Sequence, residues 1–96
     1  MEPTDRLTRR VEVDFGADAE RVLAALQALP GLPGPALGER VGAAVVKLAD
    51  GDVGRLEQQL REARTDWRDV LVAAGFEKRD WPERLDEYLG PQTIGG

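Results

Sequence analysis

The sequence predicts an all-α fold, a small helical bundle built on an antiparallel helical hairpin. Three observations lead to this prediction. Apolar residues recur at helical spacings of three and four. Glycine, proline and capping residues punctuate the pattern where helices should end or begin. The 96 residues, 42% of them hydrophobic and 32% charged, are enough for one core. We therefore expect a single domain over 1–90 and a flexible tail over 91–96.

Two short helices are expected before the hairpin. Thr4 can cap the first, and Gly16 can end it. Apolar and acidic residues also alternate over 11–15, which is the pattern of a strand, so a strand is the alternative there. Asp18 is expected to cap the second helix, which Pro30 stops. The apolar faces of the two helices are Leu7, Val11 and Phe15, then Val22, Leu23, Leu26 and Leu29.

The hairpin is expected to join helices over about 36–50 and 52–74. Its corner is Asp50-Gly51-Asp52, in which the glycine can end one helix and Asp52 can cap the next. A corner this short requires the two helices to run antiparallel. The second helix is expected to be about 22 residues long, and it could bend near Thr65-Asp66. Its apolar seam has heptad spacing and comprises Val53, Leu56, Leu60, Ala63, Trp67, Val70 and Ala74.

A short C-terminal helix is expected to follow. Asp80-Trp81-Pro82 is a start signal with proline in the first turn, and Gly90-Pro91 is an end signal. Leu85, Tyr88 and Leu89 would face inward.

Composition restricts the chemistry that this chain can perform. It contains no histidine or cysteine, and the printed sequence also lacks serine. This argues against a Cys/His metal site and an imidazole-activated nucleophile, so we expect no cofactor and no enzymatic activity. The net charge of -5 argues against nucleic acid as a partner. A weak hydrolase that uses paired carboxylates stays as an alternative.

A protein partner is the leading functional hypothesis. The run from Val70 to Ala74 is apolar on every side of its helix, so either the last helix or a second protein should cover it. Val72, opposite the seam, and Trp81 are candidate contact residues. Arg61, Arg64 and Arg68 form a basic stripe. A parallel acidic stripe beside it comprises Glu62, Asp66 and Asp69. Together they could dock a partner, although a solvated surface explains them as well. The partner could also be a second copy of the chain.

The sequence ends in Gly95-Gly96. A terminal Gly-Gly resembles the end of ubiquitin-like modifiers and sulfur carriers, and this resemblance implies conjugation through Gly96. A carrier or conjugated protein is therefore a further alternative. The first residues lack a basic segment followed by an apolar one, and no apolar run reaches membrane-spanning length. We therefore expect a cytoplasmic protein with no membrane partner.

The second half resembles small uncharacterised bacterial proteins. The resemblance rests on Gly51-Asp52, on the run Asp-Trp-Arg-Asp-Val-Leu-Val-Ala-Ala-Gly-Phe over 66–76, and on Asp80-Trp81-Pro82. It implies membership of such a family and brings no activity or ligand residues with it. Taken together, the sequence predicts a non-enzymatic interaction or regulatory module.

Overall fold

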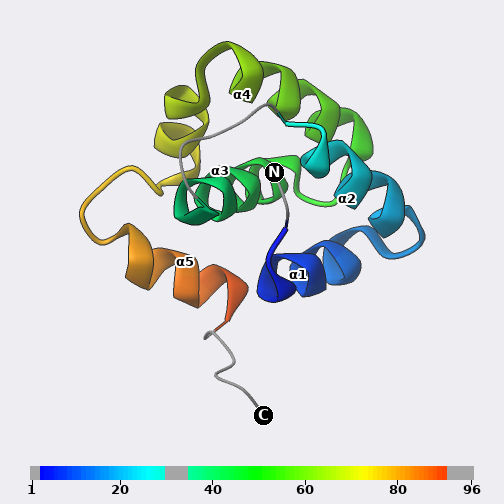
Figure 1. Ribbon diagram of the computed structural model, residues 1–96, viewed down its shortest axis with the longest axis horizontal. Helices are drawn as coiled ribbons and strands as arrows, with labels where there is room; N and C mark the ends of the chain where they lie inside the picture. The colour runs from blue at the N-terminus through cyan, green and yellow to red at the C-terminus, as the bar shows by residue number, and fades with distance from the viewer. Residues whose placement is uncertain (1–2, 30–34, 91–96) are drawn as a thin grey trace.

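The computed structural model describes residues 3–29 and 35–90, which form a helical bundle (Figure 1). The helices are α1 (Asp5–Phe15), α2 (Ala19–Gln27), α3 (Pro35–Ala49), α4 (Val53–Ala74) and α5 (Trp81–Leu89). A 3-10 turn, Gly16–Asp18, joins α1 to α2. The all-α prediction is confirmed, and over 11–15 the helix forms in place of the strand. The predicted tail lies outside the described residues.

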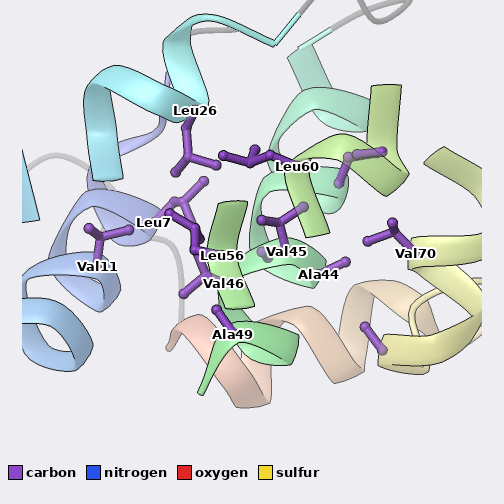
Figure 2. Packing of buried hydrophobic residues seen from close by; sticks show 14 of the residues in the cluster. Leu7, Val11, Leu26, Ala44, Val45, Val46, Ala49, Leu56, Leu60 and Val70 are labelled. Atoms are coloured by element: carbon purple, nitrogen blue, oxygen red, sulfur yellow. The ribbon is translucent and has the colours of Figure 1, made fainter. Parts of the chain in front are cut away.

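α3 is the central helix of the bundle. α4 arches over it, α1 and α2 lie on one side, and α5 lies on another (Figure 1). The helical spacing of Val41, Val45 and Leu48 predicts one buried face on this helix. That expectation was too narrow, because the whole run 41–46 is buried and Leu48 is only half-buried. A helix with neighbours on several sides buries most of its circumference, as the packing around Val45 and Val46 shows (Figure 2).

The corner between α3 and α4 matches the prediction. Asp50 and Gly51 both have positive φ values, 50° and 79°. Asp52 caps α4, because its Oδ1 accepts the backbone N–H of Arg55 at 3.1 Å. The two helices pack against each other along their length as an antiparallel hairpin.

The predicted cap of α2 is wrong in its mechanism. Asp18 precedes the helix, but its side chain makes no capping hydrogen bond, because the residue belongs to the 3-10 turn and lacks the extended backbone of a cap. Thr4 does cap α1, because the backbone N–H of Leu7 donates to Thr4 Oγ1 at 3.4 Å. Pro30 lies outside the described residues.

α5 packs on the core through apolar and aromatic residues, and cationic side chains of α1 add to this packing. Leu85 is its one fully buried residue, while Trp81, Tyr88 and Leu89 pack partly buried against the core. Arg6 Nη1 donates to Asp86 Oδ1 at 2.5 Å, and the guanidinium of Arg10 lies over the ring of Tyr88, 4.5 Å from its centroid. These contacts tie α5 to α1.

Candidate functional site

The candidate site is formed by a kink in α4. Asp66 has φ -154° and ψ 95°, which is non-helical, so α4 consists of two helical segments that meet there. Asp66 Oδ1 accepts the N–H of Arg68 at 3.1 Å and thereby caps the second segment. Thr65 Oγ1 donates to Arg61 O at 3.2 Å, a back-bond that bends helices. The bend allowed by the sequence near Thr65-Asp66 is therefore present.

A hollow of about 220 Å³ lies along this kink. Residues from both segments line it, so it depends on the angle between them. Gln58, Gln59 and Glu62 come from the first segment, and Asp69, Val70 and Ala73 come from the second. We call it the α4 hollow. Val70, 2% exposed, supplies an apolar wall that continues into the core, whereas Glu62 and Asp69 are exposed.

The two carboxylates of the α4 hollow lack cationic partners. Among residues 3–29 and 35–90, neither Glu62 nor Asp69 forms an ion pair. Arg64 lies two residues from Glu62, which places it about 160° around the helix. The carboxylates therefore leave one flank of α4 negative while arginines occupy another.

The predicted basic stripe is interrupted by the kink. Arg61 and Arg64 precede Asp66 and Arg68 follows it, and all three are exposed. The Arg68 guanidinium lies over the ring of Trp67, 5.2 Å from its centroid. None of the three arginines lines the α4 hollow.

Val72 is exposed, as a candidate contact residue must be. Its exposed fraction is 59%, and Val13 on α1, at 78%, is the other large exposed hydrophobic in the described part of the chain. Val70, Leu71 and Ala74 are buried, and the last helix does not cover Val72, so of the two expected covers a second protein is the one left for it. Val72 is the chain neighbour of Ala73, which lines the α4 hollow, although Val72 itself is not a lining residue.

Trp81, the other predicted contact residue, is half-buried at the start of α5. The guanidinium of Arg40 lies over its ring, 4.6 Å from the centroid, and Arg40 Nε also donates to Phe76 O at 2.6 Å. Burial lowers the pKa of Arg40. Trp81 therefore contributes to the packing of α5 and does not line the α4 hollow.

The buried charges form a separate cluster between helices. Arg6 and Glu39 are 8% and 7% exposed and form an ion pair. Burial on its own would raise the pKa of Glu39, but hydrogen bonds from Arg6 and from Thr4 Oγ1 outweigh it and lower that pKa. The bond to Glu39 raises the pKa of Arg6. Because both side chains are held by hydrogen bonds, this cluster is a structural clamp.

The α4 hollow provides the concave surface that a carboxylate hydrolase would need, with two acids beside it. Glycoside hydrolysis also needs an acid kept protonated by apolar surroundings. Glu62 and Asp69 are both exposed, so their surroundings are aqueous. In the described ranges, no group of three or more possible metal-binding side chains occurs.

Comparison with protein-family models, with curated proteins and with solved structures finds no match for this chain. Over the described ranges, no helix is both long and apolar enough to cross a bilayer. Gly95 and Gly96 lie outside the described residues.

Sequence reasoning did not predict the α4 hollow. Glu62 and Asp69 belong to the acidic stripe beside the arginines, whereas Gln58 and Gln59 look like ordinary solvated positions, since each lies off the apolar seam. The available signal was the pair Thr65-Asp66, two cap-forming residues in mid-helix that mark a possible restart of the helix.

Proposed function

We propose that this chain is a non-enzymatic protein-interaction module that binds its partner over the kinked face of α4. We define the α4 face as the α4 hollow together with Val72. The observation that carries the proposal is the position of the exposed Val72 beside the hollow. The proposal includes the predicted cytoplasmic location and the predicted kinship with small bacterial proteins.

A recess beside an apolar side chain resembles the anatomy of small interfaces. Binding energy in interfaces concentrates where a partner's side chain enters a pocket that excludes water. A lone exposed valine is ordinary on protein surfaces, and Val13 on α1 is an example. Val72 differs from Val13 because it borders a hollow with an apolar wall and unpaired polar groups. The limited extent of this face supports transient binding, of the kind seen in interfaces below about 1,200 Å².

Site-specific photo-crosslinking tests the proposal. The full chain carries a photoreactive phenylalanine analogue at position 72 and is irradiated in extract of the source organism. The matched control carries the analogue at position 13, which is at least as exposed but lies on α1. We expect one dominant crosslinked product from position 72, competed by excess unlabelled protein, and none of that product from position 13.

Two results would count against this proposal. Equal crosslinking from both positions would indicate indiscriminate capture, and absence of any product from position 72 would remove Val72 as a contact and with it the observation on which the proposal rests. Light scattering of the purified chain then identifies the case in which the crosslinked partner is a second copy, because such a chain is a dimer at high concentration.

A further inference from the structure

We propose that the α4 hollow is a receptor for an arginine side chain presented by the partner protein. This inference rests on the proposed function and adds the chemistry of the partner segment. The proposed occupant is a protein segment with an arginine at its centre. The guanidinium of this arginine lies at the carboxylates of Glu62 and Asp69, and its methylene stem lies against the apolar wall.

The size of the α4 hollow suits a single side chain. Its volume is about 220 Å³. Pockets for drug-sized ligands span about 300–1,000 Å³, so the hollow is small for a cofactor or nucleotide. The hollow opens to solvent, so a long side chain can enter it by displacing water.

Charge complementarity selects a cation. Glu62 and Asp69 line the hollow from its two segments, and neither has an ion pair in the described part of the chain. The chain's net charge of -5 adds a long-range attraction for basic segments. A cation placed between two unpaired carboxylates gains charge-assisted hydrogen bonds that the free protein does not make.

The rest of the lining favours arginine over lysine. Ala73, which is exposed, offers an apolar contact for the methylene stem, with the buried Val70 behind it, and long cationic side chains bury their stems readily. Gln58 and Gln59 carry amide oxygens that can accept further N–H groups. A guanidinium has five N–H donors in a planar fork and can serve acceptors on several sides, whereas an ammonium has three donors on a point charge.

NMR titration of the full, isotope-labelled chain with N-acetyl-arginine methylamide tests this inference. We expect saturable shifts of the amide signals that cluster at the lining residues, 58, 59, 62, 69, 70 and 73. The citrulline analogue has the same shape and no charge, and we expect it to bind at least tenfold more weakly. The lysine analogue should bind at least threefold more weakly than the arginine compound.

Charge-neutral variants locate the effect. Glu62→Gln with Asp69→Asn should weaken the arginine compound at least tenfold. Glu20→Gln, at an exposed position on α2, removes a charge elsewhere and should leave binding unchanged. Far-ultraviolet circular dichroism establishes that each variant is folded, as we expect for exposed positions. Equal binding of the citrulline analogue, or shifts that Glu20→Gln reduces as much as the double variant does, would overturn the inference.

The arginine titration and the crosslinking experiment can give different results, so the two proposals are tested separately. Crosslinking from position 72 to a partner segment without arginine, together with no binding of the arginine compound, refutes the occupant and leaves the α4 face as an interface. Binding of the arginine compound without any crosslink supports the receptor and counts against Val72 as a contact.

Discussion

Arg6 and Glu39 form a two-point ion pair that joins α1 to α3 inside the bundle. Arg6 Nε donates to Glu39 Oε2 at 3.0 Å, and Nη2 donates to Oε1 at 2.6 Å. The third nitrogen, Nη1, bonds Asp86 and the carbonyl of Gly90. One guanidinium thereby links α1, α3 and α5. The clamp fixes the relative positions of helices whose apolar contacts alone would permit some sliding. Its two residues differ in how much stability is lost when each one is replaced.

Removal of Arg6 should therefore cost more stability than removal of the Glu39 charge. Arg6→Met leaves a buried carboxylate with Thr4 as its remaining hydrogen-bond donor, and we expect a loss of about 3 kcal/mol in the free energy of unfolding. Glu39→Gln leaves Arg6 paired with Asp86, so the expected loss is about 1.5 kcal/mol. Urea denaturation measures both, and a double-mutant cycle gives the coupling. A larger loss for Glu39→Gln would contradict this account.

The same pair predicts a dependence of stability on pH. The folded-state pKa of Glu39 lies below its ordinary value of 4.5, so folding favours the ionised form. Its contribution is fully present above pH 4.5 and is lost as the pH falls through the lower folded-state pKa. The stability difference between the wild type and Glu39→Gln should be largest at neutral pH and should shrink in acid. Urea midpoints measured for both proteins across this range test the sign, and a difference that grows in acid would refute it.

Tyr88 should titrate late, and its hydroxyl should be dispensable. Burial raises the pKa of Tyr88 to about 12, and the charge of Asp14 adds to the effect. Tyr88 is the one tyrosine in the chain, so tyrosinate absorbance reports it without interference. We expect a midpoint near 12 in the folded protein and near 10 in urea. The contribution of Tyr88 to stability is therefore fully present below pH 10 and is lost as the pH rises toward 12.

Substitution of Tyr88 by phenylalanine completes this test. The hydroxyl is buried and forms no well-aligned hydrogen bond among the described residues, and the charged side chains of Arg10 and Asp14 lie close enough to shift its pKa in opposite directions. Because these two contacts oppose each other, we expect Tyr88→Phe to change the free energy of unfolding at neutral pH by no more than about 1 kcal/mol. A loss greater than about 1 kcal/mol would reveal a hydrogen bond worth that much.

The kink of α4 should depend on Asp66. Asp66→Ala removes the acceptor for the N–H of Arg68, and loss of such a cap costs about 1 kcal/mol. Asp66→Asn keeps an acceptor oxygen and should cost much less. Asp69→Ala is the matched control, because Asp69 is exposed and caps nothing; its effect should stay within about 0.5 kcal/mol. Equal losses for the two alanine variants, measured by urea denaturation, would contradict the role of Asp66.

Gly16 and Gly51 should both resist replacement by alanine. Gly16 has φ 52° and ψ -115°, a backbone region that is essentially restricted to glycine. Gly51 has φ 79°, and a Cβ atom there would meet the carbonyl oxygen of Asp14 at 3.2 Å. Each alanine variant should therefore lower the thermal midpoint. An unchanged midpoint for Gly51→Ala would show that the corner can shift away from α1.

Much of the helical architecture was predictable because its signals are local. Thr4, Asp52 and Gly75 act as caps in the structure, as their residue types indicate. Phe76 folds back after the left-handed Gly75, and its N–H bonds Leu71 O at 2.9 Å. The heptad seam correctly identified Leu56 and Leu60 as core residues of α4. Capping and periodicity operate within a few residues, so these features can be derived without knowledge of the neighbours.

The features that matter for binding depend on contacts between distant segments. Glu39 carries a charge and is buried because Arg6, thirty-three positions earlier, supplies two donors. Val72 belongs to an apolar run and is exposed because α5 packs elsewhere. The hollow beside Glu62 and Asp69 is lined from both segments of α4, which meet at the non-helical Asp66. Helix boundaries follow from backbone hydrogen bonds and side-chain caps that adjacent residues provide. Burial, pairing and concavity follow from where a second helix lies, and many arrangements of the same helices satisfy the local rules equally well.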